Sequence, residues 1–232
     1  MRKYVAEFIG SLFLVLTVAA AVLDQAPLAP LAIGGVLMVM VYAGGHVSGA
    51  HYNPAVTFAI LLRGRITTTE AAAYVVAQLA GGAAGALIGR WAVDPKDVTA
   101  LALSGRQLGA ALLVEVLFTF ALAYVVLNVA TSSSHTDNFF YGLAIGFTVL
   151  AGVVAVGGIS GGAFNPVVAV GGSIAGLFEW SSLWIYLLAQ AVGAGLAALA
   201  FLALNPHERG ARSIEPAAKP DAAPGAEAPA SA

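Results

Sequence analysis

Two Asn-Pro pairs lie in the most apolar parts of the chain, one in SGAHYNPAVTF (48–58) and one in SGGAFNPVVAV (160–170). Asparagine is a preferred N-cap of a helix, and proline suits the first helical position, where no amide hydrogen is needed. Each pair therefore predicts a short helix whose positive N-terminal end and asparagine NH2 group face a common space. Groups of this kind orient hydrogen-bond acceptors and repel cations, and they make or break no covalent bond.

The stretches before the two pairs would add hydrogen-bond acceptors. We expect both to run extended, so that their carbonyl groups form a ladder on one wall of a lumen. The residues that would supply these carbonyls are Gly49, Ala50, His51, Gly161, Gly162 and Ala163. Small neutral molecules would hydrogen-bond along the ladder. Two central donors, Asn53 and Asn165, would fix a water molecule there as an acceptor and so interrupt a proton wire.

The composition places these elements in a bilayer. Of the 232 residues, 59% are hydrophobic and only 9% are charged, whereas a soluble domain carries about 25% charged residues. There is no cysteine, and the net charge of −2 gives no reason to expect a nucleic-acid partner. The sequence shows no nucleophile–base pair, metal-ligand cluster or phosphate loop, so we expect neither an enzyme nor a cofactor.

Six segments are long and apolar enough to cross a membrane, which needs about 20 residues. They are 4–23, 31–47, 68–91, 108–129, 138–156 and 180–204, and two half-length apolar pieces, 54–62 and 166–176, follow the Asn-Pro pairs. The predicted fold is therefore an all-α membrane protein with six transmembrane helices and two re-entrant half-helices. Non-helical backbone is tolerated at membrane depth only where it packs against protein or lines water.

Basic residues orient the spans. Seven lie on one side, namely Arg2, Lys3, Arg63, Arg65, Arg209, Arg212 and Lys219, and three on the other, Arg90, Lys96 and Arg106. Because cytoplasmic loops carry the excess of lysine and arginine, both termini are expected in the cytoplasm, and the short loops favour a bacterial inner membrane. The channel domain would span 1–205. Residues 206–232, rich in alanine, proline and charge, predict a disordered cytoplasmic tail.

The two halves of the chain repeat each other. Residues 31–57 align without gaps to 143–169 at an offset of 112 (165 − 53), with twelve of the 27 positions identical, and Glu7 matches Glu115 at an offset of 108 (115 − 7). Each repeat, about 4–91 and 108–204, holds three spans and one half-span. Because three is odd, the second repeat must enter from the opposite side, and such inverted repeats place their site near the midplane.

With two such motifs on an inverted six-span repeat, the chain resembles the aquaporin (major intrinsic protein) family over about residues 4–204. Its first motif, Asn53-Pro54-Ala55, matches the family closely, and the second reads Asn165-Pro166-Val167, with valine where alanine is usual. The resemblance implies a homotetramer with one pore per subunit in the lipid bilayer. It also implies that Glu7 and Glu115 support the half-helix loops by accepting hydrogen bonds.

The family's outer constriction maps onto Ile33, Val153, Gly162 and Val168. Similar proteins usually carry arginine at the position of Val168, and water-selective members often carry histidine at that of Val153. We therefore expect a wider and less polar filter, which either admits larger neutral solutes or dewets. The apolar pore wall of the family corresponds to Leu14, Leu37, Leu122 and Val149, which occupy matching positions in the two repeats.

The sequence thus predicts a passive channel for water and small neutral solutes such as glycerol, urea, ammonia or peroxide, with protons and ions excluded at the midplane. Three alternatives stay open. One is a strict water channel whose filter is narrowed by backbone. Another is an alternating-access transporter, since these also use inverted repeats and broken helices. The third is a structural membrane protein with a closed pore.

Overall fold

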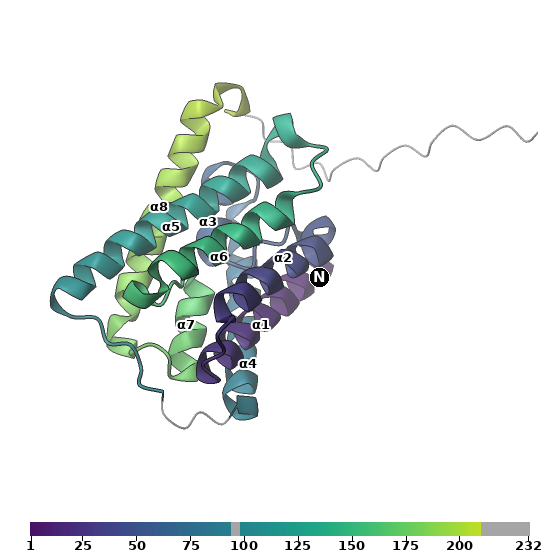
Figure 1. Ribbon diagram of the computed structural model, residues 1–232. Coiled ribbons are helices and arrows are strands. Elements are labelled where there is room, and N and C mark those ends of the chain that lie inside the picture. Colours follow the sequence, from purple (N-terminus) through teal and green to yellow (C-terminus); the bar gives the residue numbers. More distant parts are fainter. Residues whose placement is uncertain (94–97, 210–232) are drawn as a thin grey trace, which may run out of the picture.

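A computed structural model describes residues 1–93 and 98–209, and six of its helices are long and apolar enough to span a membrane. Figure 1 shows the bundle. The helices are α1 (Arg2–Leu23), α2 (Ala29–Ser48), α3 (Pro54–Leu62), α4 (Thr68–Val93), α5 (Gly105–Thr131), α6 (Tyr141–Ser160), α7 (Pro166–Ala175) and α8 (Leu183–Leu204). Three 3-10 turns accompany them: Ser133–His135, Trp180–Ser182 and Pro206–Glu208. The predicted all-α class with six spans is confirmed.

The half-helices also begin where the sequence predicts, at Pro54 and Pro166. The largest difference in a span concerns α6, which was expected at 138–156 but runs from Tyr141 to Ser160. The glycines near its end do not interrupt the helix. It stops at Gly161, whose left-handed φ of 85° closes the last turn.

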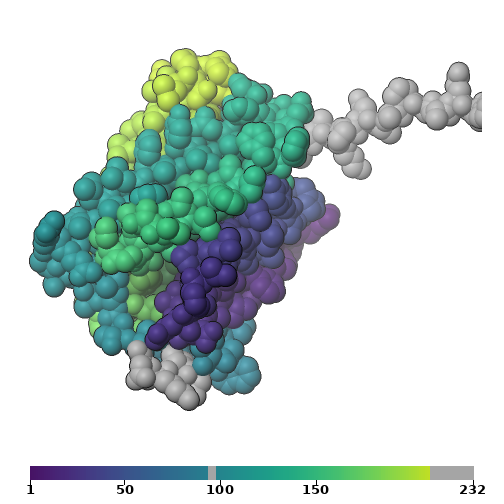
Figure 2. Space-filling view, viewed as in Figure 1, coloured from purple at the N-terminus to yellow at the C-terminus, as the bar shows by residue number. Residues whose placement is uncertain are grey.

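The repeats determine which helices pack together. Within the first repeat α1 packs against α4, within the second α5 packs against α8, and α2 and α6 join the two repeats. Figure 2 shows α2, α5 and α6 side by side on one face of the molecule. The half-helices α3 and α7 approach each other between these pairs, so the centre of the bundle lies where their N-terminal ends meet.

Glycines set the close spacing of the helix pairs. A Cβ atom added at Gly193 in α8 would lie 2.5 Å from the carbonyl oxygen of Val116 in α5. Gly34 in α2 and Gly146 in α6 likewise face each other's backbone. Small residues allow such approaches between membrane helices, where packing and not hydrophobicity drives association.

This packing predicts a position-specific effect of alanine in α8. We expect Gly193→Ala to destabilise the folded protein by about 1–3 kcal/mol, since the added methyl group meets rigid backbone. Unfolding in detergent, followed by circular dichroism, measures this loss. Gly195→Ala is the matched control, because its Cβ would lie 4.0 Å from the ring of Phe58, an ordinary contact. Equal stabilities of the two variants would contradict the packing argument.

The chain does not become irregular at residue 206, and the predicted disordered tail is wrong for 206–209. Pro206–Glu208 forms a 3-10 turn, and the Glu208 side chain is buried against Arg63 because the ion pair and further hydrogen bonds hold it there. The rest of the expected tail, 210–232, lies outside the described residues, as does Lys96.

Candidate functional site

Each half-helix begins at an asparagine whose side chain caps it. The Oδ1 atom of Asn53 accepts the backbone N–H groups of Ala55 at 2.8 Å and Val56 at 3.4 Å, and that of Asn165 accepts the N–H of Val167 at 2.9 Å. Capping fixes the oxygen of each amide toward its own helix. The NH2 group of each asparagine must therefore point away from it.

The two NH2 groups cross-link the loops. Asn53 donates to the carbonyl oxygen of Phe164 at 3.0 Å, and Asn165 donates to that of Tyr52 at 2.9 Å. Each bond uses one of the two amide hydrogens. One hydrogen per asparagine remains for the cavity that both residues line.

Glu7 holds the first loop from behind. Its buried carboxylate accepts four hydrogen bonds, from Ser48 Oγ (2.6 Å), His51 N (2.9 Å), Tyr52 N (2.8 Å) and Gln78 Nε2 (2.8 Å). Four donors match the acceptor capacity of an ionised carboxylate and satisfy a charge that would otherwise be costly in a membrane.

Glu115 repeats the arrangement in the second half. Its donors are Ser160 Oγ (2.7 Å), Ala163 N (3.0 Å), Phe164 N (2.9 Å) and Gln190 Nε2 (3.0 Å). Every donor stands 112 residues after its counterpart in the first repeat (160 − 48, 163 − 51, 164 − 52, 190 − 78). The contacts are those that loop support requires.

These amide bonds also orient the carbonyls. In a trans peptide the N–H and the preceding C=O point in opposite directions. Since the amides of residues 50–52 and 162–164 bond to the serine and glutamate side chains, the carbonyls of 49–51 and 161–163 point away from them. Five of the six predicted carbonyl residues line the central cavity, and Gly49 lies outside the lining.

The loops are not extended, which corrects the expectation from the sequence. Positive φ angles occur at Gly49 (82°), Ala50 (50°) and Tyr52 (46°) in the first loop. Gly161, Gly162 and Phe164 repeat them at 85°, 65° and 49°. An extended chain would alternate its amides between two sides, whereas left-handed residues turn successive amides toward one glutamate. In each loop, the backbone strain of the non-glycine residues with positive φ is offset by the hydrogen bonds to the glutamate side chain.

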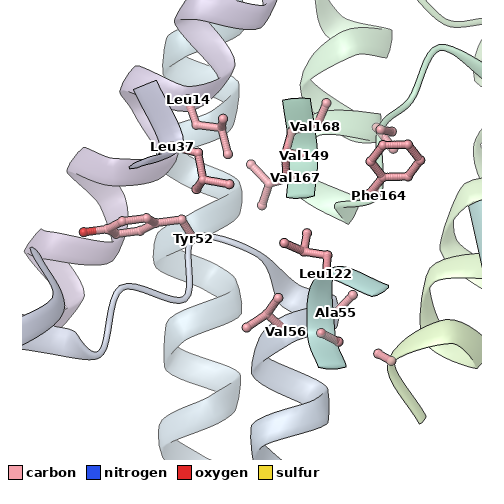
Figure 3. Close-up of a cluster of buried hydrophobic side chains, with 14 of the residues drawn as sticks. Leu14, Leu37, Tyr52, Ala55, Val56, Leu122, Val149, Phe164, Val167 and Val168 are labelled. Carbon is pink, nitrogen blue, oxygen red and sulfur yellow. The ribbon is translucent and has the colours of Figure 1, made fainter. Parts of the chain in front are cut away.

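Two aromatic rings anchor the loops in the surrounding helices. The rings of Tyr52 and Phe164 point away from the centre in opposite directions (Figure 3). The Tyr52 hydroxyl donates to the carbonyl oxygen of Met40 at 3.1 Å, and the Phe164 ring stacks on Phe118 with centroids 5.3 Å apart. The side chains therefore stay out of the lumen, and backbone remains to line it.

A cavity of about 440 Å³ passes the point where the loops meet. All four predicted filter residues line it, Ile33, Val153, Gly162 and Val168, together with all four predicted wall residues, Leu14, Leu37, Leu122 and Val149. Figure 3 shows Leu14, Leu37 and Leu122 converging on one central space. The structure thus brings together the predicted residues of both repeats around one lumen.

Part of the lining, at the end of the cavity opposite Met1 and Arg209, is not predicted from the sequence. Phe178, Leu101 and Thr99 lie there. Leu101 pairs with the segment after α7, since its N–H bonds to Leu177 O at 2.8 Å and its carbonyl accepts from Glu179 N at 3.1 Å. This bridge joins residues 76 positions apart (177 − 101), and no local motif marks it.

His51 lines the cavity and is buried. Its Nδ1 atom lies 3.1 Å from the hydroxyl of Thr57, which donates to Asn53 O at 3.1 Å and accepts from Gln78 at 3.0 Å. Because the hydroxyl hydrogen goes to Asn53, the ring nitrogen is the donor in this pair. The second repeat has no equivalent, as Ala163 and Ala169 stand at the matching positions.

The family model described as "Major intrinsic protein" matches residues 1–201, which include both half-helices and the whole cavity lining. The chain belongs to the major intrinsic protein family. Membership of this family, together with six apolar spans, makes it a membrane protein.

Other members of the family are similar along most of their length. "Glycerol uptake facilitator protein-like 6" from Lactiplantibacillus plantarum is 41% identical over 212 residues, covering 85% of this chain and 95% of that one. "Aquaporin NIP1-1" from Zea mays is 35% identical over 211 residues, covering 87% and 74%. The solved aquaglyceroporin from Plasmodium falciparum shares the fold, with a TM-score of 0.72, 20% identity and coverage of 89% and 98%.

Proposed function

We propose that this protein is a passive channel for water and small neutral solutes, glycerol among them. The observation that supports this most strongly is one lumen with donors at its centre and backbone carbonyls along one wall. Relatives named for glycerol uptake and as aquaporins are consistent with it. Small hydroxylated molecules would exchange hydrogen bonds with water for bonds to this wall, while the opposite wall stays apolar.

Proton exclusion follows from the central asparagines. Each offers one free amide hydrogen to the lumen, so a water molecule between Asn53 and Asn165 accepts two bonds and points its own hydrogens outward. Water chains on the two sides then have opposite orientations, and a proton cannot hop through. The positive N-terminal ends of α3 and α7 at the same place repel cations.

The filter proposed for this channel is apolar. None of Ile33, Val153, Gly162 and Val168 carries a donor or a charge on its side chain, although Phe178 adds a ring to the same cavity. The free-energy cost for a solute with an alkyl backbone to enter this filter is therefore lower than it would be beside an arginine. This favours solute passage over strict water selectivity.

We further propose a homotetramer with cytoplasmic termini in a bacterial inner membrane. Six spans put the two ends of the described helix bundle on one face, and Arg2, Arg63 and Arg209 lie at that face. Exposed apolar side chains such as Leu113, Leu117 and Phe147 cover the outside of α5 and α6 and suit contact with lipid or with another subunit.

Stopped-flow light scattering on proteoliposomes tests the function. We expect shrinkage in sucrose faster than in empty liposomes, followed by re-swelling in inward glycerol and urea gradients. A channel gives flux that does not saturate and depends weakly on temperature, whereas an alternating-access transporter saturates. Water flux without solute flux would support the strict water channel instead, and folded protein without any flux would support a closed structural role.

A further inference from the structure

The two half-helices are anchored differently at the ends that face away from the midplane. The C-terminal end of α7 is held from within the helix bundle, because Arg90 of α4 donates to the carbonyl oxygen of Ala175 at 2.8 Å. The corresponding end of α3 is followed directly by Arg63, which forms an ion pair with Glu208 in the 3-10 turn Pro206–Glu208. At these ends of α3 and α7, the two repeats therefore differ.

Around this end of α3, arginine and serine residues form a binding site for a carboxylate. Its members, which we call the arginine–serine pocket, are Arg63, Arg65, Ser132 and Ser133. Glu208 occupies it, with its carboxylate 2.8 Å from Arg63 Nη2, 2.6 Å from Ser133 N and 2.8 Å from Ser133 Oγ. Burial alone would raise the pKa of Glu208, but the bonds from Ser133 and the charge of Arg63 lower it to about 2.

The buried charge of Arg63 depends on the Glu208 carboxylate for compensation. Its side chain is fully buried, donates to Thr131 O at 2.7 Å and lies over the ring of Phe201. In the described part of the chain, its Nε and Nη1 atoms have no hydrogen-bond partner, so Glu208 provides its main charge compensation. A buried guanidinium left without its carboxylate is strongly unfavourable and would have to move toward water.

A movement of Arg63 would act on α3, which ends directly before it. This half-helix has only nine residues and is about 13 Å long, too short to be stable by itself, so its packing against α4, α5 and α8 and the contacts at its two ends together fix its position. Its other end carries Asn53, the central donor of the lumen.

We propose that Glu208, bound in the arginine–serine pocket, is a positioning residue that sets the axial position of α3 and thereby of Asn53. The inference rests on the proposed channel function. The pocket itself lies away from the lumen, since none of its residues lines the cavity. Loss of Glu208 therefore acts on permeability through α3 and leaves the filter residues in place.

The test compares water permeability per folded protein among variants. We expect Glu208→Gln to lower the water permeability about threefold or more. A small displacement of Asn53 slows the passage of water even when the substitution that causes it is far from the lumen. Glu208→Asp, which keeps the charge, is expected to restore most of the flux. The double variant Arg63→Gln/Glu208→Gln removes the orphaned charge, so it should regain stability, but it also lacks the ion pair that anchors the end of α3, so its water permeability should stay low. Glu179→Gln is the matched control, an exposed glutamate outside the pocket.

The proposal is overturned if Glu208→Gln has the wild-type permeability per folded protein, and Glu208 is then a purely structural anchor. If the single variant does not fold, the double variant decides in the same way. The glycerol-to-water ratio should stay unchanged in the slow variants, and a changed ratio would also count against action through α3. Wild-type liposomes that shrink no faster than empty ones would instead refute the channel function, and the positioning role with it.

Discussion

Val168→Arg is expected to abolish most glycerol flux while much of the water flux persists. Val168 is buried and lines the same cavity as the other proposed filter residues, Ile33, Val153 and Gly162. Arginine brings five N–H donors that can hydrogen-bond to water, adds a permanent charge and narrows the lumen. An alkyl chain must then pass a hydrated cation, and an added barrier of about 1.4 kcal/mol slows its passage about tenfold. Re-swelling in glycerol and shrinkage in sucrose measure the two fluxes.

The control for this substitution is Val168→Met, which fills a similar length of the lumen without charge or donors. We expect it to reduce both fluxes together, since it only narrows the passage. The apolar-filter interpretation is lost if wild-type protein already excludes glycerol, or if arginine reduces water and glycerol by the same factor. Equal reduction would mean that cavity width, and not polarity, decides which solutes pass.

Glu115→Gln is expected to prevent stable folding of the second loop. All four groups around the carboxylate donate hydrogen bonds. A glutamine places an NH2 group against two of them, so two charge-assisted bonds are lost, at about 1.5–3 kcal/mol each. The free energy of unfolding should therefore fall by about 3–6 kcal/mol, measured by denaturation in detergent alongside the water permeability.

The first repeat supplies the comparison. Glu7→Gln should have an effect of similar size, because its four donors have the same arrangement. Glu179→Gln changes the same residue type at an exposed position and should leave stability unaltered. If Glu115→Gln proved as stable as Glu179→Gln, the carboxylate would not hold the loop, and the left-handed residues there would need another source of support.

Much of the site could be predicted because its signals are local. The Asn-Pro pairs mark helix starts through capping chemistry, and the starts at Pro54 and Pro166 are those observed. The repeat offset then relates the two halves, and the structure brings the predicted wall and filter residues together at one cavity. Spacing within a repeat carries this information, since matching residues occupy matching places.

What could not be predicted depends on contacts between distant segments. The sequence predicts an extended backbone for the loops, but the direction of each amide depends on Glu7 and Glu115. These glutamates lie 44 and 48 residues away from the amides of His51 and Ala163. Glu208 lies near the start of the stretch 206–232, which is rich in alanine, proline and charge, so composition alone predicts disorder there. Phe178 lies in a segment that Leu101 bridges and its ring packs against Tyr186, and neither of these contacts is marked by a local motif.

The crossed bonds between the loops also determine the order in which the channel can be assembled. The helix pairs α1–α4 and α5–α8 each lie within one repeat, so each repeat can pack its own helices soon after it enters the membrane. Asn53 and Phe164, by contrast, are 111 residues apart, and Asn165 and Tyr52 are 113 apart. Contacts of such separation form late in folding. The lumen is therefore completed only after both repeats have been inserted, and a half-synthesised chain contains no pore through which a cell could leak.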